Sequence, residues 1–510
     1  MNVRNQSLKS IRLFTLLFPP LGLLLLWASA SLKIRRKILG TIGILLFSLL
    51  YAGVIIAMLM LFTGLEIEWR GGYPPSFTYH KTRPDYDALE KSRASQRKSG
   101  ARTLPSSGGP VPAASYWTDF RGPKRDGHYD EQPILSDWPA AGLKLLWRQP
   151  IGGGYASFTV AHGMAFTLEQ RRDEEAITAY DLETGREIWA HLYPAHFDES
   201  MGGDGPRATP TYFAGKIYSL GANGDLICLH AHAGDVVWKR NILADNRALN
   251  LYYAMSASPL IVDEKVIVQP GGTNGQSVAA YDKETGAPLW KSLDDPAAYS
   301  SPMVVELAGQ RQLLIVTEHR AVGLEVETGK LLWEFPWVVA MKNRNIAQPV
   351  LLATNRFFLS AGYGTGCTVV EVSKSGSSFS ARELWRNKSL KNKFSSSVFW
   401  EGCLYGLDED ILTCVDAGNG SRKWKDGRYG YGQVLLAGGY LVILTGEGQV
   451  ALVKATPEKY AELGRFQAIA GKTWNYPALA QGRLLVRNAL EMACFDISVE
   501  KLPATRREAD

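Results

Sequence analysis

Cysteine is scarce in this chain, which has five in 510 residues. None of the five belongs to a CxxC motif or an adjacent pair, so the sequence predicts neither a disulfide framework nor a zinc site. The motifs G-x-S-x-G and H-E-x-x-H are also missing. Their absence removes the usual sequence signals of a serine hydrolase and of a zinc metalloprotease.

A surplus of positive charge is missing from most of the chain, although the formal net charge is +6. Residues 1–115 hold 15 of the 56 Lys and Arg and 5 of the 50 Asp and Glu, which leaves 41 basic against 45 acidic residues in the remainder. Contacts to phosphates need a basic surface where binding occurs. We therefore expect no nucleic-acid partner.

Two apolar runs near the N-terminus, Leu13–Ala30 and Ile38–Thr63, contain no charged residue. About 20 apolar residues suffice to cross a bilayer, so we expect a tail over 1–11 and a transmembrane helical hairpin over 12–63. Pro19-Pro20 predicts that the first span is kinked or re-entrant. A signal peptide is the alternative for this first run, but the second run would still anchor the chain.

The segment between the two runs, SLKIRRK at residues 31–37, carries four positive charges. The positive-inside rule places such a cluster in the cytoplasm. We therefore expect a protein of the bacterial cytoplasmic membrane whose main domain lies on the periplasmic or extracytoplasmic side. Residues 64–115 have little apolar content and no sustained periodicity, which predicts a flexible linker, and residues 501–510 are expected to form a disordered tail.

The rest of the chain repeats one unit. An aromatic residue ends an expected outer strand at intervals of 39 to 52 residues: Trp147, Trp189, Trp238, Trp290, Trp333, Trp385, Trp424 and Phe466. Each interval has room for three further strands, as in SASPLIVDEKVIVQPGG followed by VAAYDKETGAPLWKS. Such a period predicts one four-stranded sheet per repeat.

The first and last pieces of the repeat complete one another. The last triplet of strands, around residues 474–498, has no outer strand after it, whereas LKLLWRQP at 143–150 has no triplet before it. Borrowing this strand would close the ring and remove exposed sheet edges. We therefore expect an all-β fold over 116–500, an eight-bladed β-propeller of four-stranded blades, preceded by the transmembrane hairpin.

The repeat A-x-D-x-x-T-G-x-x-x-W, seen as AYDLETGREIW at 179–189 and AYDKETGAPLW at 280–290, resembles the tryptophan-docking repeat of quinoproteins. The likeness to the PQQ-like β-propeller family extends over residues 117–497. That family includes quinoprotein dehydrogenases and the propeller subunit of the outer-membrane β-barrel assembly machine. The resemblance implies the fold and leaves the function open.

Two repeat columns are informative. The first residue of the motif aligns with small side chains, three of them cysteines (Cys228, Cys414 and Cys494), which we interpret as packing residues. Before each inner strand stands an uncharged hydrogen-bonding side chain: Ser157, Thr209, Ser258, Ser301, Gln348, Ser396, Gln433 and Tyr476. Two positions earlier comes an aromatic-rich set: Tyr155, Arg207, Ser256, Tyr299, Ile346, Phe394, Tyr431 and Trp474.

These residues, with Arg207, Lys393, Trp474 and Asn475, are the candidate ligand or partner surface at the mouth of the funnel. The structural alternative is that the hydroxyl groups cap strand starts and the aromatic rings wedge between blades. We expect a binding or scaffold module whose partner is an envelope protein or a small ligand, with no catalytic or metal residue assigned.

The alternative function is a PQQ- and Ca-dependent dehydrogenase of alcohols or sugars. Trp474 would then stack on the cofactor, Arg207 and Lys393 would pair with its carboxylates, and Asn475 or Asn345 would ligate calcium. However, the adjacent Cys-Cys pair of the alcohol-oxidising quinoproteins is absent, and neither column at the mouth holds a carboxylate. We therefore assign no cofactor.

Overall fold

The computed structural model describes residues 8–69, 71, 75–79, 83–98, 117–341 and 344–499. The chain divides into two compact units, Met1–Lys81 and Thr82–Asp510. The expected disordered tail, residues 501–510, lies outside the described residues.

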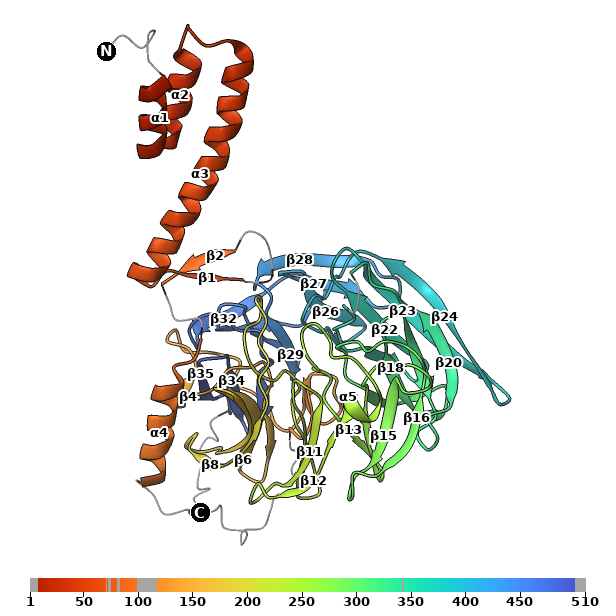
Figure 1. Ribbon diagram of the computed structural model, residues 1–510. Coiled ribbons are helices and arrows are strands. Elements are labelled where there is room, and N and C mark those ends of the chain that lie inside the picture. The colour runs from red at the N-terminus through yellow and green to blue at the C-terminus, as the bar shows by residue number, and fades with distance from the viewer. Residues whose placement is uncertain are drawn as a thin grey trace, which may run out of the picture. The chain divides into compact units, whose positions relative to one another are not determined.

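The first unit is mainly helical. Its elements are α1 (Leu8–Leu17), α2 (Pro19–Ala28), α3 (Ile34–Thr63) and a short hairpin of β1 (Glu66–Glu68) and β2 (Ser76–Thr78) (Figure 1). Side chains from all three helices, Ile11, Leu25, Leu26 and Ile44, form a small apolar cluster. α1 begins at Leu8, so residues 8–11 belong to a helix and not to the expected tail.

The structure does not confirm the expected hairpin of two spans. The first apolar run is broken at Phe18, which is extended because Pro19 and Pro20 start a new helix there. Each of the two resulting helices has 10 residues and is therefore about 15 Å long, half of a bilayer core. Among the described residues, α3, with 30, is the single helix long and apolar enough to cross a membrane.

The second unit contains eight sheets, each with four consecutive positions from the axis outward. The first four blades are β5 (Thr159–Ala161), β6 (Met164–Arg171), β7 (Glu174–Asp181), β8 (Glu187–Pro194); β9 (Thr211–Phe213), β10 (Lys216–Leu220), β11 (Asp225–His230), β12 (Val236–Asn241); β13 (Leu260–Val262), β14 (Lys265–Val268), β15 (Val278–Asp282), β16 (Pro288–Ser292); and β17 (Met303–Leu307), β18 (Gln310–Val316), β19 (Arg320–Leu324), β20 (Leu331–Pro336). A single helical turn, α5 (Ile242–Asp245), follows β12.

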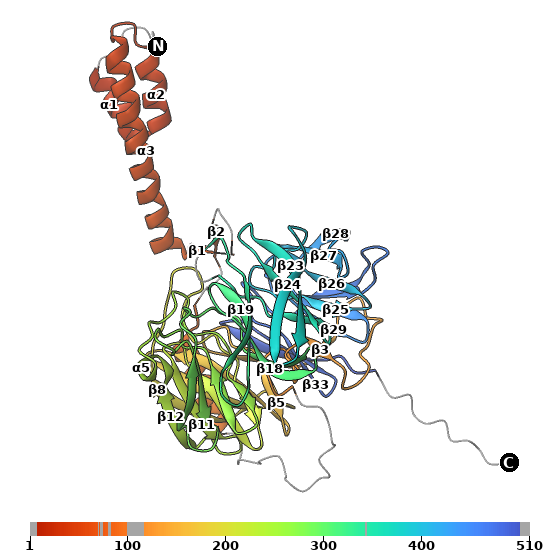
Figure 2. The ribbon, with the colours of Figure 1, turned by 90° about the vertical axis from the view of Figure 1, so that its right-hand side faces the viewer.

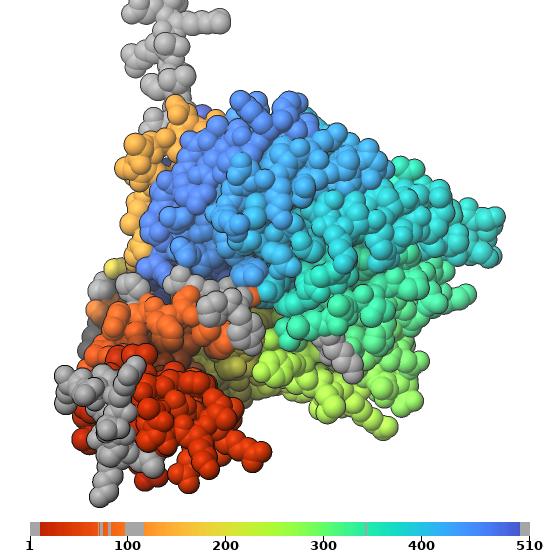
Figure 3. All heavy atoms as spheres, turned by 90° about the horizontal axis from the view of Figure 1, so that it is seen from above, coloured from red at the N-terminus to blue at the C-terminus, as the bar shows by residue number. Residues whose placement is uncertain are grey.

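The other four blades are β21 (Val350–Ala353), β22 (Arg356–Ala361), β23 (Gly366–Ser375), β24 (Ser378–Asn387); β25 (Val398–Trp400), β26 (Cys403–Asp408), β27 (Ile411–Asp416), β28 (Arg422–Arg428); β29 (Gln433–Ala437), β30 (Tyr440–Leu444), β31 (Gln449–Lys454), β32 (Glu462–Gln467); and β33 (Ala478–Ala480), β34 (Arg483–Arg487), β35 (Glu491–Asp496) with β4 (Lys144–Pro150). The colours of successive blades run around the ring from green to blue in Figure 3. The expected eight-bladed architecture is confirmed.

The expected closure is also confirmed. β4 pairs antiparallel with β35, with Trp147 opposite Cys494, and supplies the outer strand of the last blade. The same small-residue column stands opposite the docking tryptophan elsewhere, as in Cys228 opposite Trp238 and Cys414 opposite Trp424. All five cysteines are buried and unpaired by disulfides, in agreement with a packing role.

The Thr-Gly turn is the surface on which the tryptophan of the preceding blade rests. A Cβ on Gly286, which has a φ of 70°, would lie 2.7 Å from the Trp238 ring. The indole N–H of Trp238 donates to the Lys283 carbonyl at 2.9 Å, and Asp282 Oδ1 accepts the Thr285 backbone N–H at 2.8 Å. The repeat motif therefore joins each blade to the next.

Residues 64–115, expected to be a flexible linker, contain regular structure. Besides β1 and β2, the helix α4 (Tyr86–Lys98) lies in this range, while residues 99–115 are outside the described part. Asp85 precedes α4, and its carboxylate accepts the Ala88 backbone N–H at 3.1 Å, as an N-cap does. The linker interpretation is therefore wrong for α4, which a polar but helix-favouring sequence forms.

Candidate functional site: the mouth of the propeller axis

The eight hydrogen-bonding residues that precede the inner strands, here called the ring, are at most 7% exposed. Backbone N–H groups donate to the side-chain oxygen of the next blade: Ser157 to Thr209 (2.9 Å), Thr209 to Ser258 (3.0 Å), Ser258 to Ser301 (2.9 Å), Ser301 to Gln348 (2.7 Å) and Gln348 to Ser396 (2.9 Å). The circle is continued by Ser157 Oγ to the Tyr476 carbonyl (2.7 Å), the Tyr476 hydroxyl to Ser396 Oγ (3.0 Å) and Gln433 Nε2 to the Trp474 carbonyl (2.8 Å).

These contacts change the interpretation of the ring. Its side chains were candidates for an open ligand surface, but they are buried and bind one another between blades. Buried polar groups are normally satisfied in this way, and each such bond stabilises the contact of two blades. The ring is therefore a structural element.

A loop from the start of the second unit closes one end of the axis. Residues 117–129 contact the innermost strands, or the residues just before them, in several blades, and β3 (His128–Tyr129) pairs parallel with β29. In Figure 2, β3 lies between the green and the blue blades. The Arg125 guanidinium donates to the carbonyls of Ser258 (3.1 Å) and Pro302 (2.9 Å), and Arg121 donates to that of Ser397 (3.0 Å).

The charge of Arg125 is balanced locally by Asp119, at 2.9 Å. Burial raises the pKa of Asp119, and Arg125 opposes the rise. Burial likewise lowers the pKa of Arg125, against the effect of Asp119. Sequence analysis missed this axial plug, because a single pair of arginines carries no sign of carbonyl partners in distant blades.

The opposite side of the ring carries a chain of aromatic side chains in mutual contact. Trp474 stacks on Tyr155 with ring centroids 5.6 Å apart and packs against Phe394 at 4.9 Å. Phe394 in turn contacts Tyr431 at 5.4 Å. Except where they touch, these rings are half-buried rather than fully covered. The predicted aromatic set is therefore brought together for the blades that contribute these four residues.

Four cationic side chains lie over this chain of rings or beside it. Lys393 Nζ is 4.4 Å from the Tyr431 centroid and 5.2 Å from that of Tyr363, which also lies 5.4 Å from the Arg344 guanidinium. Lys472 Nζ is 4.5 Å from the Trp474 ring, and Arg207 is 5.5 Å from the Tyr155 ring. We call these cations and the rings Tyr155, Tyr363, Phe394, Tyr431 and Trp474 the collar.

Arg207 and Lys393 were expected in the collar from the sequence, whereas Arg344 and Lys472 were missed. Arg344 and Lys472 each stand two residues before a member of the aromatic-rich column, so their spacing was an available signal. Burial lowers the pKa of Lys393, and the like charge of Arg344 lowers it further, while Glu409 acts in the opposite direction.

The residues proposed for a PQQ site do not fit that cofactor. Arg207 donates to the carbonyls of Gly203 (2.8 Å) and Gly205 and lies 3.4 Å from Glu199. Asn475, fully buried, donates to two carbonyls of the first blade, at 3.1 and 3.2 Å. Asn345 is likewise buried and donates to three carbonyls.

The ligand set for a metal is also lacking in this region. In the part of the chain that the structure describes, no three His, Cys, Asp or Glu side chains are grouped so that they could hold a metal ion. Asn475 Oδ1 is buried without a hydrogen-bond partner among these residues, but one amide oxygen is not a calcium site, which takes six to eight oxygen ligands.

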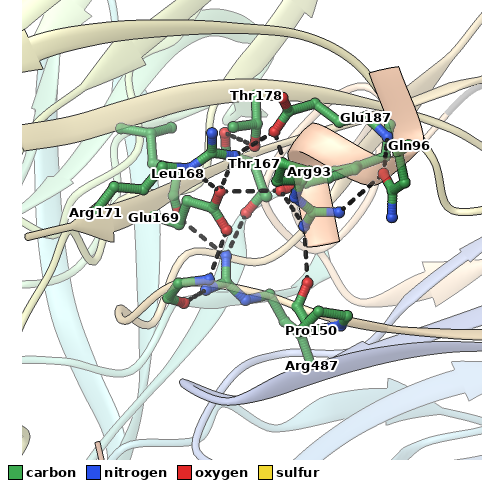
Figure 4. Close-up of polar contacts among 12 residues, drawn as sticks. Arg93, Gln96, Pro150, Thr167, Leu168, Glu169, Arg171, Thr178, Glu187 and Arg487 are labelled. Atoms are coloured by element: carbon green, nitrogen blue, oxygen red, sulfur yellow. Dashed lines mark hydrogen bonds and ion pairs between the residues drawn. The ribbon is translucent and has the colours of Figure 1, made fainter. Parts of the chain in front are cut away.

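A second cluster of charged groups lies where α4 meets the first blade (Figure 4). Arg93 of α4 is 1% exposed; its guanidinium donates to the Pro150 carbonyl at 2.7 Å and lies 3.5 Å from Glu187. Its face covers the Tyr180 ring at 4.9 Å. Arg171 joins Glu187 to the fully buried Glu169, so that α4 is bound to the propeller through a buried ionic network.

The geometry thus defines a closed eight-bladed propeller with a plugged axis and a cationic, aromatic mouth. Residues 172–426, half of the chain, match the profile of the family described as "Outer membrane protein assembly factor BamB". The chain belongs to this family of PQQ-like propellers.

Individual relatives fall into two groups. The outer membrane protein assembly factor BamB of Burkholderia pseudomallei is 21% identical over 381 residues, which cover 64% of this chain and 92% of that protein. The dehydrogenase subunit of the quinone-type alcohol dehydrogenase of Gluconacetobacter polyoxogenes is 28% identical over 196 residues, 36% of this chain, and the chain spans only 26% of that protein's length. Among solved structures, the computationally designed Ika8 protein has a TM-score of 0.51 and 10% identity, covering 69% of this chain and 100% of Ika8, which bears on the fold alone.

Proposed function

We propose that this protein is a membrane-anchored propeller that serves as a binding or scaffold module for a protein partner in the cell envelope. The observation that carries the proposal is how the axial polar groups are used. The ring residues bind one another, and Arg121 and Arg125 plug the axis. The collar is what remains at the mouth for a partner to contact.

The location follows from α3 and the charges before it. α3 is the proposed span, and Lys33, Arg35, Arg36 and Lys37 stand at its N-terminal end. The positive-inside rule puts that end in the cytoplasm, so the propeller lies on the extracytoplasmic side of the cytoplasmic membrane. An envelope location agrees with the similarity to the assembly factor BamB, which extends over 92% of that relative.

The alternative is a PQQ- and Ca-dependent oxidoreductase, which the similarity to a quinone-type alcohol dehydrogenase favours. That similarity covers 26% of the dehydrogenase, and the groups at the mouth of this chain are held by internal contacts. The binding role therefore agrees better with the geometry.

A photo-crosslinking experiment in membranes tests the proposal. With p-benzoylphenylalanine at Tyr431, we expect ultraviolet light to attach a second, reproducibly identified envelope protein, because Tyr431 is a half-buried ring of the collar. The matched control carries the same group at Leu289, which is 47% exposed on the outer strand β16.

The readout is a shifted band identified by mass spectrometry. A product that forms at Leu289 and not at Tyr431 would mean that the partner, if there is one, binds the outer strands, and a complete absence of products would contradict a binding role in the envelope.

A further inference from the structure

The collar cations form a continuous series rather than isolated charges. Arg344 and Lys393 share the Tyr363 ring, at 5.4 and 5.2 Å. Lys472 and Arg207 share the Tyr155 ring, at 6.0 and 5.5 Å. The contact between Phe394 and Trp474 joins the two pairs. Positive charge therefore follows the chain of aromatic rings across the mouth.

These cations come from four different connections between blades. Arg207 precedes β9, Arg344 precedes β21, Lys393 precedes β25 and Lys472 precedes β33. One small carboxylate does not reach groups carried by the second, fifth, sixth and eighth blades. A ligand that contacts all of them has to be an extended chain with several anionic groups.

The acidic side chains near the collar do not neutralise it evenly. Glu199 pairs with Arg207 at 3.4 Å, and Asp204 is engaged by the Tyr86 hydroxyl of the second unit. Glu409 raises the pKa of Lys393 but is not its ion-pair partner within 4 Å among the described residues. For Arg344, the structure gives no carboxylate within 4 Å in the described part of the chain; its guanidinium donates to the Tyr253 hydroxyl at 3.0 Å.

Large apolar side chains are exposed beside Arg344. Val338 and Met341, on the same connection, are 63% and 45% exposed. Tyr252 is 66% exposed and lies next to Tyr253, whose ring is 4.5 Å from the Arg344 guanidinium. A surface with cations held over aromatic rings and with apolar side chains at its edge suits a peptide that alternates carboxylates with apolar or aromatic residues.

We infer that the collar binds an acidic segment of the protein partner, in which Asp or Glu residues stand beside aromatic or apolar ones; this inference rests on the proposed function. The carboxylates pair with Arg344, Lys393 and Lys472. The aromatic side chains of the segment pack on Trp474 and Tyr431. Since Lys393 has a like-charged neighbour in Arg344, an incoming carboxylate stabilises both cations.

The test uses the full chain in detergent and a fluorescent ten-residue peptide of alternating Glu and Tyr. We expect the double variant Lys393→Gln/Lys472→Gln to bind this peptide at least 10-fold more weakly, and binding to the wild type to weaken as salt increases. A peptide of alternating Lys and Tyr is expected to bind at least 10-fold more weakly than the Glu-Tyr peptide.

The matched control is Lys239→Gln/Lys374→Gln. It removes two lysines that also lie over aromatic rings, Tyr193 at 4.8 Å and Phe379 at 5.1 Å, but on outer parts of the second and fifth blades. This control should keep wild-type affinity, and both double variants should melt as the wild type does.

Equal affinity of the collar variant and the control, or equal binding of both peptides, would overturn the inference. Binding of the wild type to phosphatidylglycerol vesicles, lost in the collar variant while the Glu-Tyr peptide is not bound, would overturn it in favour of a lipid surface. If Tyr431 crosslinks a partner but the peptide does not bind, the acidic chemistry is wrong and the proposed function stands. If both experiments are negative, both fail.

Discussion

Deletion of residues 143–150 should leave a chain that does not reach the stability of the intact protein. These residues include β4, which supplies the outer strand of the last blade through its pairing with β35. Without β4, the edge of β35 is exposed and the ring is open, which favours aggregation. We expect loss of the cooperative thermal transition and poor recovery of soluble protein, measured by circular dichroism and gel filtration.

A graded version of this experiment keeps the strand. Trp147→Ala should lower the free energy of unfolding by about 3 to 5 kcal/mol, because the buried ring rests on Gly185 and donates to the Leu182 carbonyl. Leu145→Ala, on the same strand but 46% exposed, should have a small effect. A deletion variant that melts like the intact protein would show that β4 does not close the propeller.

Replacement of Arg93 by methionine should detach α4 from the first blade. The methionine keeps an apolar stem but removes the bond to the Pro150 carbonyl and the charge beside Glu187. Removing one partner from a buried ionic network costs about 3 kcal/mol or more. We expect a lower melting temperature and faster cleavage by trypsin within residues 86–98.

The matched control is Arg83→Met, which removes an exposed ion pair with Asp198. Exposed pairs contribute about 1 kcal/mol or less, so its melting temperature should stay close to that of the wild type. If Arg93→Met and Arg83→Met melt and are cleaved alike, α4 is not held by its buried arginine.

The blade count and the closing strand could be predicted from the sequence because each repeat carries its own local signal. The Asp, the Thr-Gly turn and the tryptophan act within one blade and its immediate neighbour, as the contact of Trp238 with Gly286 shows. The small-residue column was predictable for the same reason, since Cys494 occupies the position opposite a tryptophan.

Features that depend on distant residues could not be predicted. α4 is polar, and only the structure shows that Arg93 enters a network with Glu187 and Glu169, about 80 to 95 residues away in the sequence. The ring was recognised as a column of polar residues, but the partner of each hydroxyl lies in the next blade. The first apolar run had the length of a span, yet Pro19-Pro20 divides it into two short helices.

Cofactor-dependent oxidation tests most directly whether the propeller is a binding module. Purified full-length protein would be supplied with PQQ and Ca²⁺, and reduction of an artificial dye would be followed with ethanol and with glucose. We expect no turnover above the control without PQQ, because Arg207 and Asn475 are held by backbone carbonyls. Turnover that requires PQQ and disappears in Arg207→Ala or Trp474→Ala would contradict this account and identify a dehydrogenase.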